Sequence, residues 1–192
     1  AEKALSDVLN QSGLEWQLLP GEGAFYGPKI EFVLEDCLGR KWTTGSIQLD
    51  FSMPERFGLT YIGADGEKHT PVMLHRACYG SVERFLGIII EHFAGAFPFW
   101  LAPVQIRLIP ISQKFFNYAE KIQQALDEKQ LRAEVARGDD RIGYKIRAAT
   151  LEKIPYVLVV GQNEEDHQTV NVRSREHGDM GEKTLDEFVS SL

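Results

Sequence analysis

The hexapeptide Pro98-Phe99-Trp100-Leu101-Ala102-Pro103 divides this chain into two parts with different patterns. Two prolines within six residues stiffen a short connection, which is typical of a linker between domains. A length of 192 residues is sufficient for two small domains. We therefore predict one domain over residues 1–102 and a second over residues 103–192.

The part before the linker has the pattern of an antiparallel sheet followed by one helix. Lys29–Leu34 and Ser46–Phe51 alternate apolar and polar residues, the period of a half-buried strand. Gly39-Arg40 lies between them and could form a hairpin turn. Apolar residues recur at helical spacing over Tyr79–Ala94. The first domain is therefore predicted to be α+β.

The part after the linker alternates strands and helices. The predicted strands are 104–109, 131–136, 156–160 and 169–173, and the predicted helices are 113–129, 141–151 and 184–192. Tyr156–Val160 is continuously apolar, as a central buried strand would be. This order predicts a three-layer α/β domain with a mixed sheet.

Composition excludes several classes of protein. No apolar run approaches the ~20 residues that span a bilayer, and the first ten residues do not have the pattern of a secretory signal. Cys37 and Cys78 stand alone, which fits a reducing cytoplasm. A net charge of −7 argues against nonspecific binding to nucleic acid but leaves local recognition of a structured RNA open.

Several polar residues of the first part could form a binding site. The segment Gly21–Lys29 is either an ordinary glycine-rich loop or a tight loop that presents Tyr26 and Lys29 to a ligand. Gln48 and Asp50 share one strand face, which is solvated unless it lines a cleft. His75 is a lone histidine, which is more often structural than a metal ligand.

Other polar residues lie near predicted helices. Ser81 and Arg84 open the helix of the first part, where a phosphate would be favoured; the alternative is an ordinary helix start with a Glu-Arg surface pair. In the second part, Arg141 and Lys145 share one helix face, which alone is weak evidence for RNA binding.

Longer stretches resemble the threonyl-tRNA synthetase family over essentially the whole chain. In the first part, Gly21–Phe32 and Gln48–Pro54 match its catalytic core, and Val72–Ala77 with Gly80–Phe85 resembles class II motif 3. Further matches are Trp100–Gln105 at the junction, and 139–147 with 155–161 in the anticodon domain.

The resemblance implies a threonine–tRNA ligase, an enzyme that uses ATP with Mg²⁺ to activate threonine and transfers it to threonine tRNA. By this resemblance Arg84 and Lys29 are catalytic, and Arg84 holds ATP phosphates. Tyr26, Lys29, Gln48, Ser81 and Arg84 would bind threonine or ATP. We therefore expect His75 and Arg84 to border one pocket.

The same resemblance implies a metal and an RNA partner. His75 falls on the third ligand of a catalytic zinc ion that takes the amino group and hydroxyl of threonine. Asp139, Glu164 and Arg173 fall on positions that read anticodon bases. Many members carry Asn at position 139 and Gln in place of Thr43.

The resemblance also implies that this chain is a fragment of a cytoplasmic homodimer without a membrane partner. Motif 1, motif 2 and the two other zinc ligands are expected before residue 1, so we expect the chain alone to be catalytically incomplete. The alternative is a standalone RNA-binding module that uses residues 103–192 and keeps the first part as a scaffold.

Overall fold

The computed structural model describes residues 1–192 and divides them into two compact units, Ala1–His92 and Phe93–Leu192. The division lies ten residues before the predicted boundary after residue 102. The reason is that side chains of the second unit bind carbonyls of the connecting segment. Lys153 Nζ donates to the Ala94 carbonyl, and Arg175 Nη2 donates to the Phe97 carbonyl at 2.9 Å. The proline-containing segment is therefore part of the second unit.

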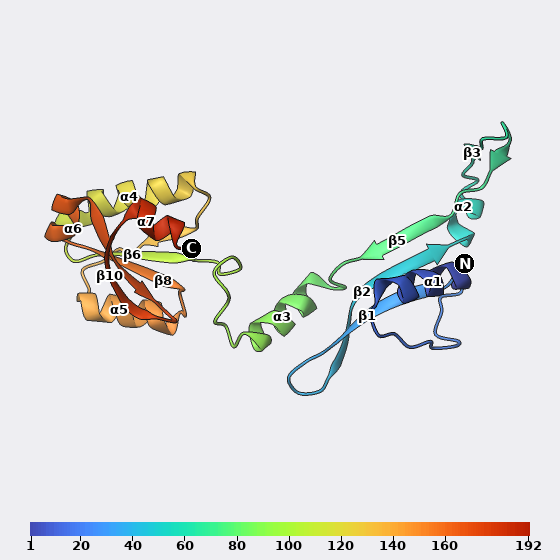
Figure 1. The fold of residues 1–192 in the computed structure, drawn as a ribbon, viewed down its shortest axis with the longest axis horizontal. Helices are drawn as coiled ribbons and strands as arrows, with labels where there is room; N and C mark the ends of the chain where they lie inside the picture. The colour runs from blue at the N-terminus through green and yellow to red at the C-terminus, as the bar shows by residue number, and fades with distance from the viewer. The chain divides into compact units, whose positions relative to one another are not determined.

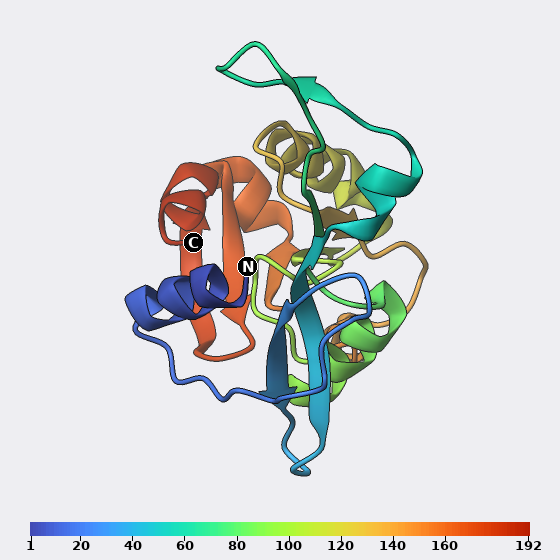
Figure 2. The same cartoon turned by 90° about the vertical axis from the view of Figure 1, so that its right-hand side faces the viewer.

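The first unit is built on a three-stranded antiparallel sheet in the order β1-β2-β5 (Figure 1). Its strands are β1 (Lys29–Glu35), β2 (Lys41–Asp50) and β5 (Met73–Ala77), with a small separate hairpin of β3 (Tyr61–Ile62) and β4 (Lys68–His69). Its helices are α1 (Glu2–Ser12), α2 (Ser52–Arg56) and α3 (Val82–His92). The antiparallel sheet and α3 were predicted, whereas α1, α2 and the β3–β4 hairpin were not. Figure 2 shows β1 and β2 running side by side into their turn.

The two faces of this sheet differ in chemistry, because directly opposite residues in paired strands point to the same side. Lys29 lies opposite Gln48, which lies opposite His75. Ile30, Ile47 and Arg76 form the neighbouring row, which points to the other side. One face of the sheet is therefore mainly polar, and the other is mainly apolar, with the Arg76 guanidinium over the Phe32 ring.

The apolar face of the first unit is not enclosed by the unit's own residues. The buried hydrophobic residues all belong to the second unit, whereas Phe32 and Leu74 of the first unit are 37% and 66% exposed. The buried residues of the first unit include Thr44, Asp50 and Pro54. Burial of apolar surface therefore stabilises the second unit far more than the first.

The second unit is a three-layer α/β domain, as predicted. Its sheet has the order β10-β9-β8-β6-β7, in which β6 is parallel to β7 and β8, and the remaining pairs are antiparallel. The strands are β6 (Ile106–Pro110), β7 (Ala133–Val135), β8 (Tyr156–Val160), β9 (Thr169–Ser174) and β10 (Gly178–Thr184). The helices are α4 (Phe116–Glu128), α5 (Ile142–Leu151), α6 (Gln162–His167) and α7 (Leu185–Ser190), with a 3₁₀ turn at Gln113–Phe115. The sequence pattern had missed α6 and β10.

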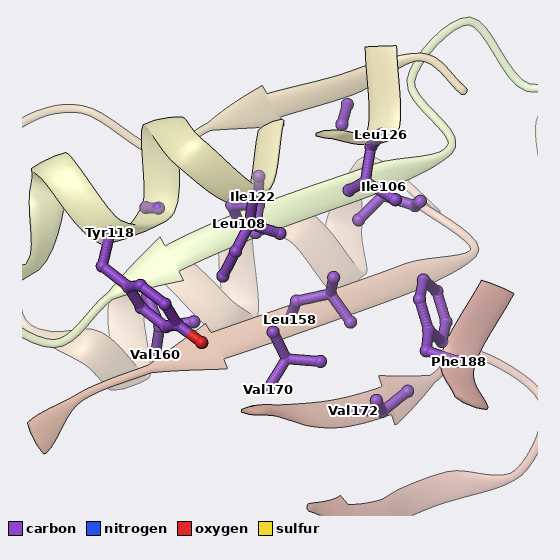
Figure 3. Packing of buried hydrophobic residues seen from close by; sticks show 12 residues of the cluster. Ile106, Leu108, Tyr118, Ile122, Leu126, Leu158, Val160, Val170, Val172 and Phe188 are labelled. Atoms are coloured by element: carbon purple, nitrogen blue, oxygen red, sulfur yellow. The ribbon is translucent and has the colours of Figure 1, made fainter. Parts of the chain in front are cut away.

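Two hydrophobic cores cover opposite faces of this sheet. The larger core joins α4 and α7 to the central strands, with Leu108, Leu158 and Phe188 completely buried (Figure 3). The smaller core joins α5 to the other face through Ile109 and Val157. Buried side chains along β6 and β8 thus point alternately to the two faces of the sheet, and helices cover both faces. None of the helices combines the length and apolar character that a membrane crossing requires.

Candidate functional site

Tyr26 is brought to the polar face of the first sheet by the glycine-rich loop before β1. The loop lies against β2, because Leu49 N–H donates to the Pro28 carbonyl and Phe51 N–H donates to the Tyr26 carbonyl, both at 3.1 Å. Gly27 permits this approach, since a Cβ there would lie 2.2 Å from the Leu49 carbonyl oxygen. The Tyr26 hydroxyl then donates to Gln48 Oε1 at 2.8 Å.

A cavity of about 240 Å³ opens beside Tyr26 and His75. Its lining residues are Phe25, Tyr26, Asp50, Ser52, Met53 and His75. The rings of Tyr26 and His75 are 5.9 Å apart between centroids. A cavity of this size suits a small molecule with a few polar groups.

His75 is held in the cavity wall by Asp50. His75 Nε2 lies 2.8 Å from Asp50 Oδ2, and the Asp50 side chain is 1% exposed, whereas that of His75 is 42% exposed. The other oxygen of Asp50 accepts hydrogen bonds from the N–H groups of Ser52 and Met53, at 2.9 Å each. Burial alone would raise the pKa of Asp50, but hydrogen bonds from Met53, His75 and Ser52 together lower it, so the carboxylate is ionised at neutral pH.

Lys29 lies in the same cross-strand row as Gln48 and His75 but outside the cavity lining. Its ammonium group forms an ion pair with Glu31 at 2.8 Å. Lys29 thus lies on the polar face and is paired with the carboxylate of Glu31. An anionic ligand would have to compete with that carboxylate for the Lys29 ammonium group, or displace it.

Arg84 is located at the start of α3 and does not line the cavity. The expectation that His75 and Arg84 border one pocket is therefore not met by this cavity. The Arg84 guanidinium carbon lies 5.9 Å from the Trp42 ring centroid, within the range of a cation–π contact. Trp42 Nε1 donates in turn to Asp36 Oδ2 at 2.7 Å. Ser81 Oγ accepts from the Arg84 N–H at 3.3 Å, as a helix N-cap does, and donates to Glu83.

The residues of this chain do not make a complete zinc site. No group of three His, Cys, Asp or Glu side chains that could hold a metal ion is present among residues 1–192. A catalytic zinc ion requires about three protein ligands, and His75 could supply one. Cys37 and Cys78 are free and exposed.

In the second unit, two of the three predicted anticodon-reading residues lie after the carboxyl ends of parallel strands. Asp139 follows β7, and its carboxylate accepts a hydrogen bond from Gln113, which follows β6. Glu164 belongs to α6, directly after β8, and its carboxylate accepts from the Gly161 N–H at 2.8 Å. Ligands of open α/β sheets commonly bind at this edge.

Arg173 lies further along the sheet. It is opposite Val157, near the beginning of β8, and is therefore displaced from the edge that carries Glu164. Its guanidinium lies 3.3 Å from Asp179 of β10. Asp139 and Glu164 thus share one edge of the sheet, whereas Arg173 is located on its exposed surface.

Sequence reasoning missed three contributors to these sites. Gln48 and Asp50 were placed on one strand face, but only Gln48 was assigned to the site. The signal for Asp50 was its position just before α2, because an aspartate side chain commonly accepts hydrogen bonds from backbone N–H groups two or three residues later. Trp42 and Gln113 gave no local signal, because their contacts with Arg84 and Asp139 join distant parts of the sequence.

Two family models match adjoining parts of the chain. Residues 1–93 match the tRNA synthetase class II core domain (G, H, P, S and T), and residues 105–192 match the anticodon binding domain. Between them, these matches cover the chain except residues 94–104, and the first is a match to the core domain of class II tRNA synthetases.

Curated relatives that match the whole chain are threonine–tRNA ligases. The chain is 54% identical over all 192 residues to a threonine–tRNA ligase of Acetivibrio thermocellus and 55% identical to that of Caldanaerobacter subterraneus subsp. tengcongensis. It also resembles the crystal structure of the RNA binding domain of threonyl-tRNA synthetase from Cryptosporidium parvum Iowa II. That match has a TM-score of 0.89 and 39% identity, and covers 100% of this chain and 48% of that one. The chain is thus similar over its whole length to threonine–tRNA ligases, and it spans 30% of the length of the curated relatives.

Proposed function

We propose that this chain is part of a threonine–tRNA ligase that activates threonine with ATP and Mg²⁺ and transfers it to threonine tRNA. The observation that carries the proposal is the polar row Lys29–Gln48–His75 across three strands, beside a cavity that also contains Tyr26. An RNA-binding module would have no chemical need for this row.

In this proposal the cavity receives the amino acid. His75 supplies one ligand of a zinc ion, which when bound would take the amino group and hydroxyl of threonine. Tyr26 and Gln48 hold each other by their hydrogen bond and present polar atoms to the substrate. Lys29 and Arg84 serve the ATP phosphates as cations, with Ser81 at the start of the same helix.

Catalysis is proposed to require the remainder of the enzyme. The chain spans 30% of its curated relatives, and the apolar face of its first sheet is available to another layer of protein. A threonine-dependent ATP–pyrophosphate exchange assay should therefore show no turnover with this chain alone. Normal turnover would contradict this part of the proposal.

The second unit is proposed to read the anticodon of threonine tRNA through Asp139, Glu164 and Arg173. The exposed Arg173 and the Asp139–Glu164 edge offer donors and acceptors to unstacked bases. Both carboxylates already accept hydrogen bonds from protein groups. A donor on a base edge would therefore bind the carboxylate beside those protein donors or replace them.

This role can be tested by comparing the affinity of the chain for threonine tRNA with that for tRNAs altered at the second and third anticodon bases. We expect Glu164→Ala and Arg173→Ala to reduce discrimination, by about tenfold per lost base contact. Arg137→Ala is the matched control, because Arg137 is 73% exposed and pairs with Glu120. Equal binding of all tRNAs by the unaltered chain would favour a general RNA-binding module instead.

The family resemblance also supports a homodimer that acts in the cytoplasm. The exposed free thiols of Cys37 and Cys78 agree with a reducing compartment. Analytical ultracentrifugation of the longer enzyme would test the homodimer.

A further inference from the structure

We propose that Lys145 of α5 binds a phosphate oxygen of an RNA strand at the carboxyl end of the parallel strands of the second unit. The contact does not depend on the identity of any base, and it adds to the base reading proposed for Asp139, Glu164 and Arg173. The inference rests on the proposed function only in taking this edge of the sheet as the edge that binds RNA.

Lys145 lies on the buried side of α5. The helical spacing placed it on one face with Arg141, but Lys145 is 9% exposed and shares the buried side with Ala149, whereas Arg141 is exposed. Lys145 Nζ lies 5.8 Å from the ring centroid of Phe116, the first residue of α4. The side chain of Lys145 therefore reaches from the first turn of α5 to the beginning of α4.

The ammonium group of Lys145 has no anionic partner in this chain. It forms no hydrogen bond or ion pair with a protein group, and the contact that it makes is with the ring of Phe116. Burial of a charge without an anion costs free energy, which a contact with an aromatic ring offsets only in part. The three N–H donors of the ammonium group are therefore available to oxygen atoms of a ligand.

Lys145 is located where α/β sheets commonly bind ligands. The chain leaves β6 for α4, which packs on one face of the sheet, and leaves β7 for α5, which packs on the other. Connections that diverge in this way from neighbouring parallel strands open a crevice at their carboxyl ends. No side chain caps the first N–H groups of α5, and this end of a helix favours an anion. The lysine and the helix thus favour negative charge at the same place.

The neighbouring carboxylates indicate an RNA phosphate rather than a free anion. Asp139 and Glu164 accept hydrogen bonds from protein groups at this edge, and their charges repel any anion. A strand whose bases bind Asp139 and Glu164 also brings its phosphates to this edge. Lys145 offsets the repulsion as a compact positive charge, which binds phosphate without reading the sequence.

A simpler interpretation is that the stem of Lys145 serves only to cover Phe116. Lys145→Met separates the two interpretations, because methionine retains an unbranched apolar stem and removes the charge. The matched control is Lys121→Met, since Lys121 is exposed on α4 and its replacement removes the same charge. A general loss of positive charge affects both variants alike, whereas the loss of a phosphate contact affects only Lys145→Met.

The experiment measures the affinity of the full chain for an RNA stem-loop with the anticodon loop of threonine tRNA, at several salt concentrations. We expect Lys145→Met to weaken binding about tenfold and to reduce the slope of log Kd against log salt by about one. Stem-loops altered at the second and third anticodon bases should show the same factor, because all of them carry the phosphate. Lys121→Met should change neither quantity. Equal effects of the two variants, or an effect of Lys145→Met confined to the unaltered anticodon, would overturn the inference.

A second measurement uses the unaltered chain and so does not depend on the folding of a variant. In NMR of ¹⁵N-labelled lysine ammonium groups, the Lys145 signal should shift on addition of the stem-loop. Inorganic phosphate should shift it only at much higher concentration. A signal that stays in place while the stem-loop binds would contradict the contact, and tighter binding of inorganic phosphate would assign the site to a free anion instead.

The same data distinguish this inference from the proposed function. If the unaltered chain binds all stem-loops equally and Lys145→Met still reduces the salt slope, anticodon reading is refuted and the phosphate contact of Lys145 stands. If the chain discriminates between anticodons and Lys145→Met behaves like Lys121→Met, the reverse holds. Absence of binding to every stem-loop would refute both.

Discussion

The Tyr26 hydroxyl donates a hydrogen bond of 2.8 Å to Gln48 Oε1, joining a loop residue to a strand residue 22 positions later. This contact fixes the glycine-rich loop over the polar sheet face, and it places the Tyr26 ring beside His75. The shape of the cavity depends on a pairing that no local sequence pattern specifies.

Removing this hydrogen bond should loosen the first unit. We expect Tyr26→Phe to lower its free energy of unfolding by about 1 kcal/mol, because the Gln48 carbonyl loses its donor. Urea denaturation followed by fluorescence would measure the change. Tyr144→Phe is the control, since Tyr144 is 63% exposed, and an equal loss in both variants would contradict the role of the Tyr26 hydroxyl.

The first unit should lose stability in acid. Burial alone would raise the pKa of Asp36, but hydrogen bonds from Trp42 and Arg40 lower it far below 3.8, and the pKa of Asp50 is lowered as well. A carboxyl group whose folded-state pKa is lowered contributes stability that is complete above its unfolded pKa, near 3.8, and that is lost as the pH falls toward the folded-state value.

We therefore expect the unfolding free energy to be flat above about pH 5 and to fall below about pH 4. Asp36→Asn should make the remaining dependence shallower, whereas Asn at the exposed Asp7 should not. Urea denaturation at several pH values measures both slopes. Increasing stability on acidification would show that the sign is wrong.

Arg175 should protect residues 93–99, at the start of the second unit, from proteolysis. Its guanidinium donates to the Lys153 carbonyl at 2.7 Å and to the Phe97 carbonyl at 2.9 Å. Arg175→Ala should increase the rate of limited proteolysis within residues 93–99 several-fold, because the local opening energy decreases. Arg137→Ala provides the control, since Arg137 contacts only Glu120 in an exposed ion pair. Unchanged cleavage at this segment would show that Arg175 does not fix it.

The second unit should need the connecting segment for full stability. A chain of residues 93–192 retains the edge-on contact between Phe99 and Tyr156, whose ring centroids are 5.6 Å apart, and the two carbonyls that bind Arg132. A chain of residues 105–192 loses these contacts. We expect it to be less stable by about 2 kcal/mol or more, judged by urea denaturation. Equal stability of the two chains would place the boundary after the prolines instead.

Much of the fold could be predicted from the sequence because its patterns are local. The apolar run Tyr156–Val160 became the central strand β8 with the same bounds, and the alternation after Lys29 became β1. The helix α6 was missed because six polar residues show no apolar period, and its cap comes from Glu164 binding the Gly161 N–H.

The sequence by itself determined the change of pattern between its two parts, the similarity to threonine–tRNA ligases and the side chains available to the site, since these depend on residue type, spacing and order. Only the tertiary structure decided that Asp50 is buried against His75, that Trp42 lies beneath Arg84, and that Arg173 is displaced from Glu164. The physical reason is that strand register and side-chain burial arise from contacts between residues far apart in the chain. The short-range periodicity of the sequence does not indicate those contacts.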